Sequence, residues 1–166
     1  MDHELILSLG SNIEPKRVHL ENAVKKLNEV FIFNKISLLY ETEAVDYIEQ
    51  DDFYNICISY FTEINDPFLV LDKILKIEND LGRDRDVNIP KGPRVIDIDI
   101  LLFGEYEINT DRLTIPHERM FERRFVLEPL VEILPKSSLF FSKYDIKCSL
   151  DKVKMQKIST IGALLS

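Results

Sequence analysis

The chain has 166 residues, 45% of them hydrophobic and 30% charged, which is an ordinary composition for one globular domain over residues 1–166. Its formal net charge of −8 argues against a general nucleic-acid-binding protein, which would need a basic surface. The first residues lack the pattern of a signal peptide, and no apolar run approaches the roughly 20 residues of a membrane span. Cys57 and Cys148 are far apart and without metal-ligand spacing, so we expect reduced thiols in a cytoplasmic protein.

The spacing of apolar residues predicts the order strand, helix, strand, strand, helix, strand. Gly10-Ser11-Asn12 predicts a strand-to-helix turn with capping residues, and Pro15 suits the first turn of the helix that follows. The expected ranges are 4–9, 15–30, 31–40, 53–63, 66–82 and 95–103.

The third expected strand alternates between two faces. Tyr54 and Ile56 share one face, while Phe53 and Asn55 project side by side from the other. Phe53 could simply pack in a core. Asn55, whose amide can donate and accept at once, is a candidate for binding the edge of a heterocycle.

The second helix ends at Gly82, a natural position for a helix C-terminus. Glu78 lies in its last turns, where the helix dipole disfavours a negative charge. This misfit makes Glu78 a candidate site residue, with a solvated helix face as the alternative interpretation.

The segment 83–94 has no periodicity and contains two prolines. Long connections without regular structure are often binding loops or lids, and this one gathers cations in an otherwise acidic chain. Guanidinium groups suit phosphate oxygens. The cations are Arg83, Arg85, Lys91 and Arg94.

The apolar strand that follows this loop is interrupted by Asp97 and Asp99. A pleated strand places both on one face, with Cβ atoms roughly 6.5–7 Å apart, while Ile96, Ile98 and Ile100 point to the core. Carboxylates at this spacing can hold one divalent ion or bracket two. The alternative is a half-exposed strand whose acids face water. The preceding loop favours metal-assisted phosphoryl transfer.

Downstream, residues 112–117 are expected to be extended, since the residue before Pro116 avoids helix. A helix is expected from Glu118 through Leu130, with Pro129 near its end. His117 stands between the two, either as a structural or as a functional histidine. The chain beyond Pro135 is mixed and polar and predicts little.

The six main elements predict a ferredoxin-like α+β sandwich, a mostly antiparallel four-stranded sheet with both helices on one face. The second face would then be free to carry a substrate cleft with Asp97, Asp99, Phe53 and Asn55. Three functions remain open from the residues alone. They are an enzyme of metal-assisted phosphoryl transfer, a nucleotidyltransferase that uses the same aspartates, and a non-catalytic ligand-sensing module with an acidic metal site.

Four segments together resemble the 6-hydroxymethyl-7,8-dihydropterin pyrophosphokinase family, and the similarity runs from about Leu5 to Pro135. They are Leu9-Gly10-Ser11-Asn12, the stretch from Gly92 to Ile100, Leu113-Thr114-Ile115-Pro116-His117, and the stretch from Arg123 to Leu130. The resemblance implies transfer of a pyrophosphoryl group from ATP to the pterin hydroxymethyl oxygen, with release of AMP, by a protein that we expect to be a monomer.

The resemblance also implies a role for each site residue. Asp97 and Asp99 would hold two Mg²⁺ ions on the ATP phosphates, and Arg83 and Arg94 would act on the phosphates as catalytic residues. The family pattern places further residues near ATP: Glu78, Arg85, Arg112, Thr114, His117 and Arg123. It places others around the pterin: Thr42, Val45, Phe53, Asn55 and Phe125. Lys91 departs from the pattern, since the family commonly has an aromatic residue there.

Overall fold

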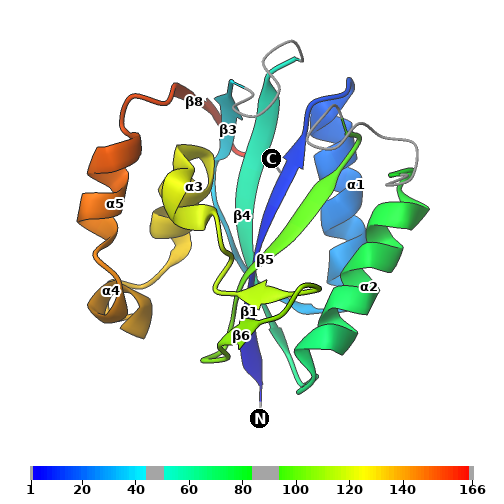
Figure 1. Ribbon diagram of the computed structural model, residues 1–166. Helices are drawn as coiled ribbons and strands as arrows, with labels where there is room; N and C mark the ends of the chain where they lie inside the picture. Colours follow the sequence, from blue (N-terminus) through cyan, green and yellow to red (C-terminus); the bar gives the residue numbers. More distant parts are fainter. Residues whose placement is uncertain (1, 44–50, 84–93, 165–166) are drawn as a thin grey trace.

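A computed structural model of the chain describes residues 2–43, 51–83 and 94–164. A twisted antiparallel sheet forms its centre, with helices on both faces (Figure 1). The strands are β1 (His3–Ser11), β2 (Ile32–Ile36), β3 (Leu39–Thr42), β4 (Phe53–Thr62), β5 (Asp97–Phe103), β6 (Ile108–Asn109), β7 (Thr114–Ile115) and β8 (Ile158–Gly162). The helices are α1 (Lys16–Asn28), α2 (Pro67–Asp80), the 3-10 helix η1 (Met120–Glu122), α3 (Arg124–Ile133), α4 (Leu139–Lys143) and α5 (Ile146–Val153).

The strand order of the main sheet confirms the ferredoxin-like prediction. The order is β5-β1-β4-β3-β8, and β2 also pairs with β4. Each of these pairings is antiparallel. The sheet is larger than the four strands expected, because β8 adds an edge strand and because the expected strand 31–40 is divided into β2 and β3.

The division of that strand has a local cause at Ser37. The Ser37 N–H donates to the Cys57 carbonyl over 2.9 Å, while the Ser37 hydroxyl accepts from the Cys57 N–H, also over 2.9 Å. A side-chain oxygen thus takes the place of a backbone acceptor. The ladder with β4 is interrupted there and resumes at Tyr40, opposite Asn55.

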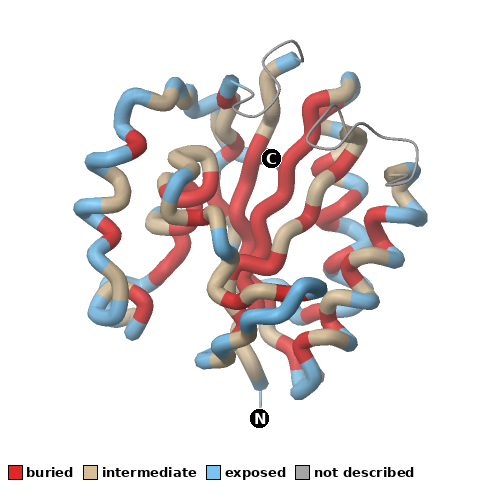
Figure 2. The backbone as a smooth tube through the Cα atoms, in the orientation of Figure 1, coloured by how far each residue is buried: buried red, intermediate tan, exposed pale blue. Residues whose placement is uncertain are grey.

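The first face of the sheet carries the main core. Leu5, Leu7 and Leu9 of β1 are fully buried, because odd-numbered positions of this strand point toward α1 and α2. Figure 2 shows the resulting buried centre along β1 and β4. The placement of α1 and α2 on this one face was correctly predicted.

The second face is not free, contrary to the prediction. Ile6, Cys57 and Leu101 on this face pack in a second core with Val126 and Leu130 of α3. The segment beyond Pro135, from which the sequence predicted little, contributes α4 and α5 to this layer (Figure 1). The apolar part of this face therefore lies beneath these helices, while Asn55 lies near the start of β4, and Asp97 and Asp99 lie at the start of β5.

Two local predictions were wrong. Gly10 and Ser11 belong to β1, and α1 begins only after Pro15, so the Gly-Ser-Asn segment does not cap the helix. The helix expected from Glu118 is divided into η1 and α3, because Arg123 between them has an extended backbone with φ −125° and ψ 109°. Pro129 lies inside α3, whose burial against the second core outweighs the hydrogen bond that proline removes. No helix in the described ranges has both the length and the apolar character needed to cross a bilayer.

Candidate active site

Asp97 and Asp99 lie on β5 with their side chains on the face opposite the core, as the alternation predicted. Ile96, Ile98 and Ile100 between and beside them are buried. The Asp97 carboxylate pairs with both arginines that flank the segment 84–93. Arg83 contacts its Oδ1, and Arg94 Nη1 lies 3.4 Å from its Oδ2. The two cations thus gather at one carboxylate.

Glu78 joins the end of α2 to the start of β5. Its Oε2 accepts a hydrogen bond from the Ile98 N–H over 2.8 Å and pairs with Arg83 Nη1 over 2.8 Å. The Glu78 side chain is only 2% exposed. The charge that is disfavoured by the helix dipole is therefore stabilised by Arg83 and by a backbone donor of the neighbouring strand.

Burial and the mutual proximity of the three acids Glu78, Asp97 and Asp99 shift the pKa values of the site. Burial first, and then repulsion by Asp97 and Glu78, raises the pKa of Asp99 to about 7. Burial opposes the charge of Arg83, but Asp97 and Glu78 outweigh it, so the pKa of Arg83 rises and the guanidinium stays charged. Two carboxylates close together, one of them with a raised pKa, are an arrangement that a bound cation would stabilise.

His117 faces Asp99 from the segment after β7. Its Nε2 lies 4.0 Å from Asp99 Oδ2, and its Nδ1 accepts a hydrogen bond from the Arg119 N–H over 3.2 Å. Burial, and then the charge of Arg123, lowers the pKa of His117. The neutral ring therefore carries its proton on Nε2, on the side of Asp99.

These groups open into a cavity of about 600 Å³, here called the arginine cavity. It is lined by eight of the predicted residues: Arg83, Arg94, Asp97, Asp99, Arg112, Thr114, His117 and Arg123. The Nε atoms of Arg83 and Arg94 are buried and have no hydrogen-bond partner among the described residues. Buried donors without an acceptor suit an anionic ligand, and phosphate oxygens fit them.

The donor set fits Mg²⁺ that is shared with a nucleotide. Within the described ranges no group of three or more His, Cys, Asp or Glu side chains is placed to hold a metal ion. Asp97 and Asp99 would thus supply two carboxylates, and phosphate oxygens would have to complete the shell. Mg²⁺ is commonly bound in this way, by one or two carboxylates together with substrate phosphates.

Thr42 and Asn55, two of the predicted pterin residues, lie on strands beside this cavity. The Asn55 Nδ2 donates to the Thr42 hydroxyl over 2.7 Å, and both side chains are buried. Gly10 of β1 pairs with Asn55 on one side and with Asp97 on the other. A Cβ at Gly10 would lie 2.9 Å from Asn55 Oδ1, so glycine permits the Asn55 side chain to lie over the central strand.

Each predicted aromatic residue carries an arginine on its ring. Arg94 lies over Phe53, with its guanidinium 5.2 Å from the ring centroid, and Arg123 lies over Phe125 at 5.5 Å. In each of these cation–π contacts a planar guanidinium covers one face of the ring. Phe53 projects from β4 and Phe125 from the first turn of α3, so the two rings come from different elements.

Sequence reasoning missed the role of Asn12. Its Oδ1 accepts from the Arg94 N–H over 2.8 Å, its backbone N–H donates to the Arg94 carbonyl over 3.3 Å, and its Nδ2 donates to the Asp51 carbonyl over 3.3 Å. Asn12 thus holds the chain immediately before β4 and β5. An asparagine directly after a buried strand was the available signal, but it was interpreted as a cap.

Other predicted residues lie at the edge of the site or outside the description. Arg112 is exposed, pairs with Asp72 of α2 and lies 5.9 Å from the Phe68 ring centroid. Val45 and Arg85 lie outside the described residues. The arginine cavity also includes Leu71, Leu75 and Arg119, which the sequence did not single out.

Comparison with known proteins shows the family to which the chain belongs. Residues 6–135 match the model of the family described as 7,8-dihydro-6-hydroxymethylpterin-pyrophosphokinase (HPPK). The chain belongs to this family. It is 43% identical over 135 residues to the 2-amino-4-hydroxy-6-hydroxymethyldihydropteridine pyrophosphokinase of Bacillus subtilis (strain 168), an alignment that covers 80% of this chain and 79% of that protein.

Other relatives are longer proteins. The chain is 39% identical over 132 residues to a folate synthesis bifunctional protein of Arabidopsis thaliana, covering 79% of this chain but 27% of the relative. Among solved structures, a Plasmodium falciparum HPPK-DHPS has a TM-score of 0.69 at 19% identity and covers 92% of this chain and 45% of that one. The chain spans less than half of these two proteins, and the structural similarity concerns the fold.

Proposed function

We propose that this chain transfers the pyrophosphoryl group of ATP to 6-hydroxymethyl-7,8-dihydropterin, as a step of folate biosynthesis. The hydroxymethyl oxygen would attack the β-phosphorus, and the bond from this phosphorus to the oxygen that bridges it to the α-phosphate would break. The products are AMP and the pterin diphosphate, and the hydroxyl proton is released. The observation that carries this proposal is the placement of Asp97 and Asp99 in the arginine cavity, in a chain that belongs to the HPPK family.

Arg83 and Arg94 are proposed to bind the transferred phosphates. Both contact Asp97, and their Nε atoms lack acceptors among the described residues. Phosphate oxygens would take over these guanidinium donors and neutralise the charge that develops during transfer. Arg123 and His117 line the same cavity and are proposed to contact ATP, together with the residues Glu78, Arg85, Arg112 and Thr114.

Asp97 and Asp99 are proposed to hold two Mg²⁺ ions jointly with the ATP phosphates. When bound, Mg²⁺ would supply charge neutralisation and orient the phosphates for in-line attack. The protein's own contribution is to hold both carboxylates on one face of a rigid strand. The neighbouring Glu78 carboxylate is bound by the Ile98 N–H and by Arg83.

The pterin is proposed to bind between Phe53 and Phe125, with its edge on Asn55. The buried Asn55 amide is oriented by Thr42, which accepts from its Nδ2 and thereby directs Oδ1 toward the region above Gly10. The proposed ring site thus lies next to Asp97, across Gly10. Val45 is assigned to the same site from the family pattern.

One assay tests the reaction. The protein is incubated with ATP, Mg²⁺ and 6-hydroxymethyl-7,8-dihydropterin, and the nucleotide products are separated. We expect AMP that forms only when the pterin is present. Release of pyrophosphate would instead indicate a nucleotidyltransferase, and ATP binding without either product would indicate a ligand-binding module.

Asp97→Asn and Asp99→Asn test the two carboxylates. Each removes one negative charge at nearly constant volume, and each is expected to lower kcat about a hundredfold or more. Asp151→Asn, an exposed position on α5, is the matched control and should retain activity. Near-native turnover by either cavity variant would show that the metal assignment is wrong.

We also propose a cytoplasmic monomer that does not bind nucleic acid. Both cysteines are free thiols, Cys57 buried and Cys148 exposed, which supports a reducing compartment. The net charge of −8 supports the absence of general nucleic-acid binding. Sedimentation of the purified chain, with and without ATP, would measure the oligomeric state.

A further inference from the structure

Gln156 lies between α5 and β8, outside the residues 6–135 that match the family. Its side-chain amide contacts the backbone on both sides of Arg123. Nε2 donates to the Glu122 carbonyl over 2.8 Å, and Oε1 accepts from the Arg124 N–H over 2.9 Å. One amide side chain can donate and accept at once, as the backbone of a neighbouring strand would do.

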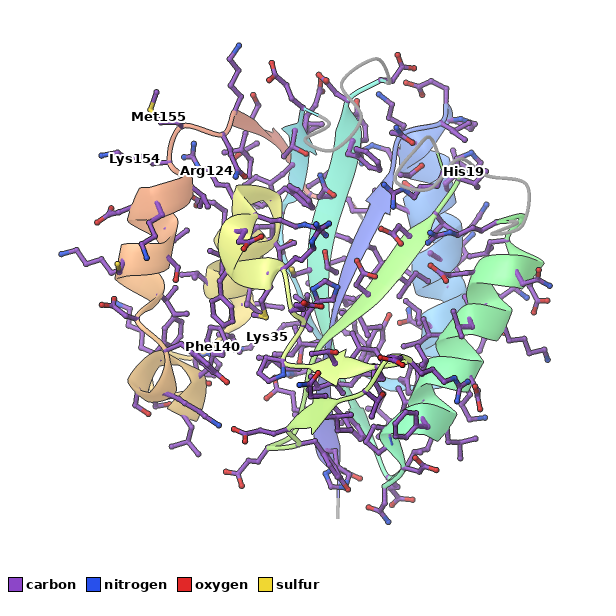
Figure 3. The ribbon with its side chains drawn as sticks, viewed as in Figure 1. His19, Lys35, Arg124, Phe140, Lys154 and Met155 are labelled. Carbon is purple, nitrogen blue, oxygen red and sulfur yellow. The ribbon has the colours of Figure 1, made fainter. Side chains whose placement is uncertain are left out.

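Arg124 binds the same segment in return. Its Nη1 donates to the Lys154 carbonyl over 3.1 Å and to the Gln156 carbonyl over 2.9 Å. Figure 3 shows Arg124 beneath this turn, with Met155 pointing away from the molecule. Met155 is 86% exposed, so the contacts of this segment with the site run through Gln156 and the backbone on either side of Met155.

The residue enclosed by these contacts lines the arginine cavity. Arg123 has an extended backbone between η1 and α3, and its guanidinium lies over Phe125. A single extended residue between two helices is held in its orientation by the hydrogen bonds of its neighbours. The Gln156 amide supplies such bonds directly before and directly after Arg123.

Two residues further along, the same segment reaches the opposite wall of the proposed pterin site. Ile158 begins β8 and pairs with Thr42 of β3. Thr42 in turn accepts the hydrogen bond of the buried Asn55 amide. The short stretch from Gln156 to Ile158 therefore connects the backbone that presents Arg123 and Phe125 with the strand that orients Asn55.

We propose that Gln156 is a positioning residue that sets Arg123 and Phe125 relative to the Thr42–Asn55 wall of the substrate site. This inference rests on the proposed function. It assigns a role in substrate binding to a segment outside the family match. Gln156 contacts no substrate itself and acts through the backbone of residues 122–124.

Steady-state kinetics of Gln156→Ala against Met155→Ala test the inference. Loss of the two hydrogen bonds of the Gln156 side chain is expected to raise KM for the pterin about tenfold, which is the effect of roughly one net hydrogen bond. We expect kcat to stay within about twofold. A merely structural role would lower the folded fraction, which reduces kcat and leaves KM unchanged. Gln156→Glu keeps an acceptor for the Arg124 N–H but places a carboxylate oxygen against the Glu122 carbonyl, so its KM should rise as well.

The outcomes separate this inference from the proposed function. If the wild-type protein forms no AMP in the presence of the pterin, the proposed function fails, and this inference fails with it. If the wild type is active but Gln156→Ala has an unchanged KM, only the positioning role is overturned. An equal rise in KM for Met155→Ala would also overturn it, because that variant keeps the amide.

Discussion

Glu78→Ala is expected to destabilise the folded protein more than any exposed substitution on the same helix. The Glu78 carboxylate accepts from the Ile98 N–H over 2.8 Å and pairs with Arg83 over 2.8 Å, with side-chain exposures of 2% and 10% for the two partners of the pair. Alanine removes both contacts and provides no acceptor in their place. The N–H of Ile98, at the start of β5, then loses its acceptor.

The magnitude follows from these two losses. A buried donor left without an acceptor costs about 1–3 kcal/mol. Removing one partner of a buried ion pair costs about 3–5 kcal/mol when the other charge is left alone, but Arg83 retains Asp97 here. We therefore expect the free energy of unfolding to fall by about 3 kcal/mol. Glu78→Gln keeps an acceptor for Ile98 and loses only charge assistance, so it should cost about 1 kcal/mol.

Urea unfolding followed by circular dichroism measures this difference. With a slope of about 2 kcal/mol per molar urea, a loss of 3 kcal/mol lowers the midpoint by about 1.5 M. Asp80→Ala, exposed two residues further along α2, is the matched control and should change stability by no more than about 0.5 kcal/mol. Equal midpoints for the Glu78 and Asp80 alanine variants would refute the reasoning, as would a glutamine variant as unstable as alanine.

Three further predictions concern other parts of the site and core. Because the folded-state pKa of Asp99 is about 7, above the ordinary value near 3.9, the metal-free protein should lose stability as pH rises from about 4 to 8. In Asp99→Asn the urea midpoint should therefore change less with pH than in the wild type. Parallel plots of midpoint against pH for the two proteins would contradict this prediction. Gly10→Ala should raise the pterin KM about tenfold, because a Cβ 2.9 Å from Asn55 Oδ1 displaces the amide; an unchanged KM would exclude this contact. Burial raises the pKa of the Cys57 thiol, so a thiol reagent should modify only Cys148 in the folded protein and both cysteines in urea, and fast modification of Cys57 would show an open second core.

The sequence predicted the parts of the site that depend on strand periodicity. The alternation of β5 placed Asp97 and Asp99 on the face opposite Ile98, and the structure has them there. The alternation of β4 likewise separated Asn55 from the buried Ile56. Both predictions hold because a period of two is a local property of the extended chain, independent of what packs against it.

Predictions that depended on which helices and strands pack against each other were less successful. The second sheet face was expected to be open, yet α3 and α5 lie on that side, because the apolar face of α3 had no other core in which to be buried. The segment beyond Pro135 was not interpreted, although Ser138 and Asp145 each accept a hydrogen bond from the first turn of a helix. Short helices of this kind depend on tertiary packing and carry little periodic signal.

By itself, the sequence determined the ferredoxin-like order of the main elements, the face on which the two aspartates lie, and the gathering of cations before them. Only the tertiary structure decided the partners of these groups. It placed Glu78 on the Ile98 N–H, Asn12 on Arg94 and Gln156 on Arg124, contacts that join residues 20, 82 and 32 positions apart. Such bonds leave no mark in local periodicity, because they form only when packing brings distant backbone groups within hydrogen-bond distance.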